Sequence, residues 1–101
     1  MKKITILVLA LSAFLYSNDI DGKEVFKTYC WGCHHETAEA FGPSFSEIAN
    51  NRSKDEIRAY IIDPKAMYEA FGYKRTVMTE FNLSDKELDA VTNYILLQKG
   101  K

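Results

Sequence analysis

The chain has 101 residues, of which 47% are hydrophobic and 27% are charged, a composition typical of one globular domain. Its 13 basic and 14 acidic residues give a formal net charge of −1, and no basic stripe runs along the sequence. The composition excludes a disordered or collagen-like chain, and the charge pattern argues against a nucleic-acid partner.

The N-terminal segment has the pattern of a secretory signal peptide: two lysines precede an apolar stretch over residues 4–16. Because a bilayer-spanning helix needs about 20 apolar residues, this stretch is short for a permanent anchor. We expect cleavage after Ser17, although Leu15 stands where the site prefers a small residue, so an uncleaved membrane anchor is the alternative. Residues 1–17 are therefore predicted to be a signal peptide, and residues 18–101 a domain exported to a bacterial periplasm.

A first helix is predicted over residues 20–29, where apolar residues recur at helical spacing. Asp21 and Glu24, three positions apart, resemble a capping box at its start. The helix leads directly to Cys30, so this cysteine is expected to stand at a helical end.

Residues 38–51 are predicted to be mostly irregular. The run Gly42-Pro43-Ser44-Phe45 is a loop signal, because glycine and proline interrupt regular structure. At most a short helical turn is expected at residues 47–49.

A second helix is better marked. Ser53 and Glu56 form a capping box, an apolar stripe follows, and Pro64 ends the helix. Pro64 also suits the first position of another short helix, which we expect to run through Tyr68.

The remaining chain is predicted to be a long loop followed by the clearest helix. Residues 71–82 show no periodicity, and loops of this length in small domains are usually functional or disordered. Ser84 and Glu87 form a third capping box, apolar residues then repeat at helical spacing, and Gly100 lies at a suitable stop. Because no alternating strand pattern occurs, the expected fold class is all-α with long connecting loops.

The pentapeptide Cys30-Trp31-Gly32-Cys33-His34 has the spacing of a covalent haem attachment site. Two thiols three positions apart on a helical turn can both add to the vinyl groups along one edge of a haem, and the next imidazole then lies under the iron. The sequence therefore predicts one haem c, bound covalently through Cys30 and Cys33, with His34 as the proximal metal ligand.

Three other interpretations of this motif are open. A thioredoxin-like dithiol would need a βαβ setting and would leave His34 unexplained. A zinc site would need a fourth ligand, although the only histidines are the adjacent His34 and His35 and no third cysteine exists. The motif could also be accidental in a chain that binds nothing. His35 is not expected to be a second axial ligand, because a direct neighbour of His34 does not reach the opposite face of a haem.

The second axial ligand is predicted to be a methionine, and the exported chain offers Met67 and Met78. Met67 follows Pro64 in a helical turn, a position more typical of core packing. Met78 lies in the long loop, six residues before Ser84, where its thioether could cross the distal face of a haem. Met78 is therefore the candidate metal ligand, with core packing as its alternative role.

These features together resemble the monohaem class I cytochrome c family over most of the exported chain, residues 21–98. The matching stretches are residues 30–34, 42–45, 77–81 and 83–94. The resemblance implies a cytochrome c fold of three to five helices with long loops around one covalently bound haem, in which the final helix crosses the first.

The resemblance also implies roles for two further cofactor-binding residues. A carbonyl at the position of Pro43 accepts a hydrogen bond from the ring N–H of the histidine ligand, here His34, and such a bond fixes the tautomer. An arginine near the position of Arg52 often holds a haem propionate, and a solvated surface arginine is the alternative. Thr79 departs from the family pattern, because the methionine ligand is often followed by proline.

The resemblance predicts an electron carrier and not an enzyme. If His34 and Met78 occupy both axial positions of the iron, no position is left for a substrate. Such a carrier is expected to be a monomer that meets redox donors and acceptors transiently, and to contact a membrane only if the signal segment stays uncleaved. Two alternatives are open. One is a haem subunit or anchored module of a larger periplasmic oxidoreductase, for example in sulfur-compound oxidation, and the other is a haem sensor or peroxidase with a vacant sixth position.

Overall fold

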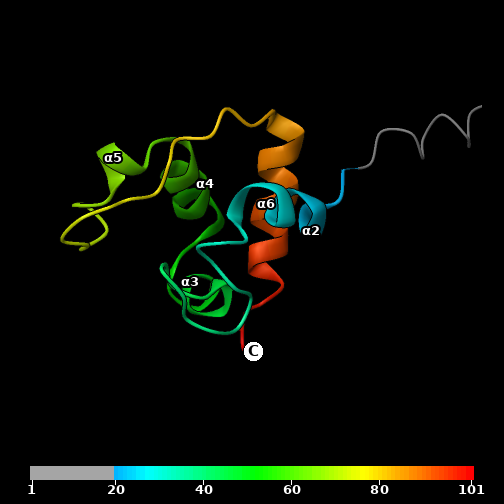
Figure 1. Ribbon diagram of the computed structural model, residues 1–101, viewed down its shortest axis with the longest axis horizontal. Coiled ribbons are helices and arrows are strands. Elements are labelled where there is room, and N and C mark those ends of the chain that lie inside the picture. The colour runs from blue at the N-terminus through cyan, green and yellow to red at the C-terminus, as the bar shows by residue number, and fades with distance from the viewer. Residues whose placement is uncertain (1–19) are drawn as a thin grey trace, which may run out of the picture.

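The computed structural model describes residues 20–101, so the predicted signal peptide at residues 1–17 and its cleavage site lie outside the described residues. Within the described part the chain is helical and contains no strand, which confirms the all-α prediction. None of the helices between residues 20 and 101 is long and apolar enough to cross a membrane. The elements are α2 (Gly22–Val25), the π-helical turn η1 (Phe26–Cys30), α3 (Phe45–Asn51), α4 (Lys54–Ile62), α5 (Pro64–Met67) and α6 (Asp85–Leu96) (Figure 1).

The first helix occupies its predicted place but differs from the prediction in two details. Its second half, Phe26–Cys30, is the wider π-helical turn η1, a geometry that frequently occurs at functional sites. Asp21 caps the helix by accepting a hydrogen bond from the Lys23 amide at 3.0 Å. The reciprocal half of the predicted capping box does not form, and the Glu24 carboxylate instead faces the ammonium group of Lys27 at 3.8 Å.

Helix α3 corrects the prediction that residues 38–51 are mostly irregular. The helix runs over Phe45–Asn51, longer than the single turn expected at residues 47–49. Its start is set by Ser44, whose hydroxyl accepts a hydrogen bond from the Glu47 amide at 3.1 Å. This Ser-x-x-Glu spacing is a helix-start signal that lies directly behind the Gly-Pro loop signal in the sequence.

The capping boxes predicted for the other helices are confirmed. In α4, the Ser53 amide donates to the Glu56 carboxylate at 2.9 Å, and the Glu56 amide donates to the Ser53 hydroxyl at 3.2 Å. Ser84 and Glu87 exchange the same pair of bonds at the start of α6. Pro64 opens α5, as its fixed backbone angle favours.

Helix α6 is the centre of the fold, because it packs against α2, α3 and α4. The apolar core cluster lies between these helices, and Thr92 of α6 is fully buried beside it, where its hydroxyl donates to the Leu88 carbonyl at 2.7 Å. The members of the cluster are Val25, Phe26, Phe45, Ala49, Ile57, Ile61, Leu88, Val91 and Ile95.

Helices α2 and α6 cross in close contact, as the family resemblance implied. Gly22 lies at this crossing, where an added Cβ would collide with the Ala90 carbonyl and would lie 2.8 Å from the Tyr94 Cβ. Only glycine permits this approach, so the first helix is fixed against the last at its start, eight residues before Cys30.

The chain between α5 and α6 has no regular structure after its first turns, as predicted (Figure 1). We call residues 68–83 the distal loop. Met78 and Leu83 pack against the buried core from this loop. Phe81 contacts Tyr29 of η1, with ring centroids 5.7 Å apart, so the loop also touches the helix that carries the cysteines.

Candidate haem site

The attachment turn begins where η1 ends. The amides of Cys33 and His34 both donate to the carbonyl of Cys30, at 3.3 and 3.0 Å, so residues 30–34 continue as one tight turn. Both cysteines are free thiols; Cys30 is half-buried and Cys33 is exposed. Burial, followed by the proximity of Cys33, raises the pKa of the Cys30 thiol to about 11. The turn thus presents two unbridged sulfur atoms at the i, i+3 spacing that predicted haem attachment.

His34 is held in one tautomer by the Gly-Pro loop. Its Nδ1 lies 2.8 Å from the Pro43 carbonyl oxygen. Because a carbonyl oxygen only accepts hydrogen bonds, Nδ1 carries the proton and Nε2 retains the lone pair that a metal ion needs. The resemblance implied this hydrogen bond, and the structure contains it.

Gly42 lies directly against the imidazole of His34. A Cβ at this position would lie 2.5 Å from the His34 Cε1 atom and 2.9 Å from Nδ1. On another side, the ring of Phe45 lies 5.5 Å from the imidazole, between centroids. The imidazole is therefore held between a backbone segment that must be glycine and a buried aromatic ring.

Backbone bonds fasten the chain after the motif to the start of α3. Gly42 donates to the Cys33 carbonyl at 2.7 Å, and Phe45 donates to the His35 carbonyl at 2.9 Å. Glu36 extends this connection to α6, because its carboxylate accepts a hydrogen bond from the Tyr94 hydroxyl. Burial, followed by the hydrogen bond and charge of Glu36, raises the pKa of Tyr94 to about 12. Tyr94 and Glu36 are 58 positions apart, so no local sequence signal indicates this pairing.

Met78 is half-buried against the core cluster that Cys30 also contacts. Its amide donates to the Thr76 hydroxyl oxygen at 3.3 Å, and the Tyr60 hydroxyl donates to the same oxygen at 3.1 Å. Helix α4 therefore holds the backbone of Met78 through Thr76.

Met67, the other candidate, is half-buried at the end of α5. It is not among the described residues that pack against the main core, so the core packing predicted for Met67 does not occur in this cluster.

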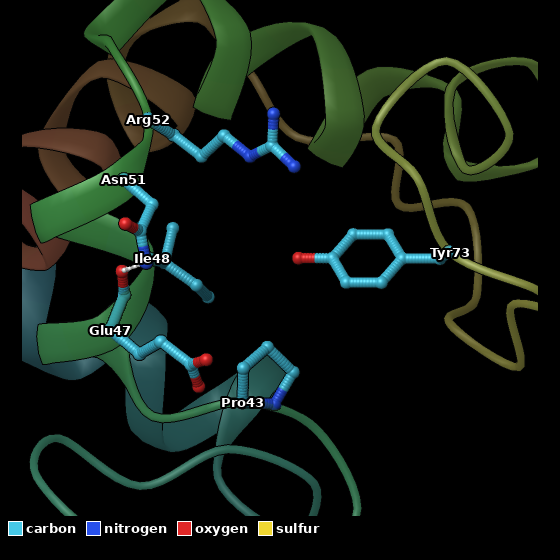
Figure 2. Close-up of a pocket in the computed structure, with 6 residues that line it drawn as sticks. All are labelled: Pro43, Glu47, Ile48, Asn51, Arg52 and Tyr73. Atoms are coloured by element: carbon cyan, nitrogen blue, oxygen red, sulfur yellow. Dashed lines mark hydrogen bonds between the residues drawn. The ribbon is translucent and has the colours of Figure 1, made fainter.

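A hollow of about 220 Å³ lies between α3 and the distal loop (Figure 2). Pro43, which holds His34, forms one of its walls, and Tyr73 reaches toward it from the distal loop (Figure 2). The lining combines apolar surface with polar groups: Pro43, Glu47, Ile48, Asn51, Arg52 and Tyr73. Of these residues only Pro43 and Ile48 are wholly apolar, so the hollow has a mixed polar and apolar lining.

Arg52 lines the hollow, but its guanidinium is engaged with protein groups. One nitrogen, Nη2, donates to the Phe71 carbonyl at 2.6 Å, and Nη1 lies 3.7 Å from the Glu56 carboxylate. The guanidinium carbon also lies 4.3 Å from the centroid of the Phe71 ring. The propionate contact that the resemblance implied for Arg52 stays a prediction.

The residues present fit a covalently attached haem. The two free thiols, the imidazole with a free Nε2 and the half-buried thioether of Met78 are the donor set that such a group requires. The absence of any strand between residues 20 and 101 also leaves the thioredoxin-like interpretation without its βαβ setting.

Comparison with known proteins gives the same assignment. Residues 20–99 match the sequence model of the cytochrome c family. A cytochrome c6-like protein of Nostoc sp. (strain PCC 7120) is 28% identical over 113 aligned residues, which cover 100% of this chain and 97% of the relative. Haem c is the covalently bound cofactor of the family, and Cys30 and Cys33 are the cysteines with which this chain binds it. The chain belongs to the cytochrome c family.

Proposed function

We propose that the protein is a periplasmic electron-transfer protein that carries one electron on its haem c, with His34 and Met78 as the axial ligands. The observation that carries this proposal is the 2.8 Å hydrogen bond from His34 Nδ1 to the Pro43 carbonyl, because it leaves the unprotonated Nε2 available as a metal ligand. The bound haem supplies an iron that alternates between the ferrous and ferric states.

The side chains around the site would tune this exchange. The Pro43 carbonyl makes the imidazole of His34 a stronger donor by polarising its N–H bond. The soft thioether of Met78 favours ferrous iron and so raises the reduction potential relative to two nitrogen ligands. With both axial positions occupied by side chains, no position is left for a substrate, so we propose no enzymatic activity.

Electron exchange with a partner is supported by the exposure of the attachment turn. Cys33 is exposed, and Trp31 between the two cysteines has 59% of its surface accessible. Redox proteins could therefore approach the edge to which the thioethers attach, and brief contact through a small patch is sufficient for a carrier. We propose a monomer with transient redox partners and no nucleic-acid ligand. Its periplasmic location is supported by the signal-like pattern of residues 1–17.

A second candidate function, a haem subunit of a larger periplasmic oxidoreductase, is favoured by exposed apolar side chains. Phe41 is 89% exposed and Val77 is 86% exposed, on the two loops that flank His34 and Met78 in sequence. Large exposed apolar residues favour lasting contacts when they form one patch. The mass of the native protein by size-exclusion chromatography discriminates between the two functions: a monomer supports the carrier, and a stable complex supports the subunit.

The proposal is tested by replacing the two candidate methionines in the exported holoprotein. Met78→Ala should abolish the weak absorption band at the red end of the visible spectrum that reports iron–sulfur ligation, whereas Met67→Ala should retain it. A pyridine haemochrome assay with intact mass should give one covalent haem for both variants. If the band survives in Met78→Ala, the proposed ligand is wrong.

A further inference from the structure

We infer that Arg52 is a positioning residue for Met78, because its side chain clamps the start of the distal loop onto the end of α3. We call the contacts of Arg52 with Phe71 and Tyr73 the arginine clamp. The inference rests on the proposed function in one respect, namely that Met78 is the axial ligand whose position matters.

The clamp combines a hydrogen bond from one terminal nitrogen with ring contacts of the same guanidinium group. Nη2 donates to the Phe71 carbonyl at 2.6 Å, and the flat face of the cation lies over the Phe71 ring at 4.3 Å and near the Tyr73 ring at 6.0 Å. Nη1 lies 3.7 Å from the Glu56 carboxylate, which orients the group from the side of α4. A charge-assisted hydrogen bond and a cation–π contact thus act on the same loop residue.

The clamp acts on a segment of the distal loop that backbone hydrogen bonds, from Phe71 to Met67 and from Tyr73 to Tyr68, connect to the end of α5. Tyr60 of α4 contacts the rings of Phe71 and Tyr73, with centroids 5.2 and 5.8 Å apart. The two rings are therefore contacted by Tyr60 as well as by the cation of Arg52. Met78 follows Tyr73 by five residues, so fixing Tyr73 limits the volume that the Met78 side chain can sample.

Arg52 meets protein oxygen atoms on two sides: Nη2 donates to the Phe71 carbonyl of the distal loop, and Nη1 faces the Glu56 carboxylate of α4 at 3.7 Å. The side chain also closes the hollow from the side of α3, while Tyr73 faces it from the distal loop (Figure 2). Arg52 thus joins the two walls of the hollow.

The first experiment titrates the ferric holoprotein with imidazole, which displaces the Met78 sulfur from the iron. Loss of the red absorption band reports the displacement. Imidazole binds only when the loop has released the iron, so its apparent affinity rises in proportion to that open fraction. Arg52→Gln should raise the apparent affinity about tenfold, because a charged hydrogen bond and a cation–π contact are lost. Arg58→Gln is the matched control: Arg58 makes a surface contact with Asp89 at 3.4 Å, and its loss should leave the affinity unchanged.

Two further variants separate the clamp from a simple effect of charge. Arg52→Lys keeps the positive charge but loses the planar fork, so it should behave like Arg52→Gln. In a Phe71→Leu background, the rise in apparent imidazole affinity caused by Arg52→Gln should be smaller by about threefold, because the cation–π contact is already lost. Three outcomes would refute the clamp. Arg52→Lys could bind imidazole like the wild type, or Arg52→Gln could bind it like Arg58→Gln. The effects of Phe71→Leu and Arg52→Gln on the affinity could also simply add in the double variant.

The wild-type spectrum distinguishes failure of this inference from failure of the proposed function. A wild-type holoprotein without the iron–sulfur band would refute Met78 ligation, and the clamp with it. A wild-type band whose displacement by imidazole does not respond to Arg52→Gln would refute the clamp alone.

Discussion

The helices around the attachment turn and the distal loop are held by different kinds of contact. Around the turn, α2 meets α6 at Gly22 with no space for a methyl group, and His34 is packed against Gly42 and Phe45. The distal loop contains no helix. It is held by Arg52, by Tyr60 and by the ring contact between Tyr29 and Phe81.

This difference indicates how the two axial ligands would respond to denaturant or to mutation of their surroundings. A side chain fixed by close packing moves only when the helices move, whereas a loop fixed by a few contacts can open while the core stays intact. We therefore expect the Met78 side of the site to open at lower free energy than the His34 side. The following predictions test that ranking.

The largest effect is expected at the helix crossing. Gly22→Ala would place a methyl group against the Ala90 carbonyl and 2.8 Å from the Tyr94 Cβ, and should lower the free energy of unfolding by about 3 kcal/mol. Denaturant unfolding of the holoprotein, followed by far-ultraviolet circular dichroism, measures this loss. Gly32→Ala is the control, because no atom lies within 4 Å of its added Cβ. Equal losses in both variants would contradict the close crossing.

A smaller and more local effect is expected in the distal loop. Thr76→Val removes the oxygen that receives hydrogen bonds from the Met78 amide and the Tyr60 hydroxyl, and should make opening of the loop easier by about 1 kcal/mol. The iron–sulfur band should then disappear at lower denaturant concentration while the helices unfold as in the wild type. Thr79→Val, at an exposed neighbour, is the control. Simultaneous loss of band and helices in Thr76→Val would mean that the loop does not open separately.

The smallest effect is expected from Tyr94, which ties α6 to the chain after the haem motif. Its pKa is raised from 10.0 to about 12, so the folded state holds this proton more tightly than the unfolded chain. The resulting stability is complete below pH 10 and is lost as the pH rises to about 12. The free energy of unfolding, measured across this pH range, should decline less steeply for Tyr94→Phe than for the wild type. Identical pH profiles would show that Tyr94 does not contribute in this way.

Local signals explain why much of the fold was predictable. Ser53 and Ser84 accept hydrogen bonds from amides within one turn, and Pro64 fixes its own backbone angle, so these helix starts can be recognised from residue type and spacing alone. Helix α3 is longer than the short turn predicted at residues 47–49, because the capping signal of Ser44 stands directly after the loop signal of Gly42 and Pro43 and is obscured by it. The π-helical form of η1 depends on packing around it and has no comparable local signal.

The sequence by itself determined the cofactor and its attachment, because Cys30, Cys33 and His34 act through covalent spacing within a single turn. It also determined that two methionines were available beyond residue 17. Only the tertiary structure decided that Arg52 reaches Phe71 and that Thr76 joins Met78 to α4. These contacts join residues that are distant in the chain, and only the packing of the helices brings such residues together.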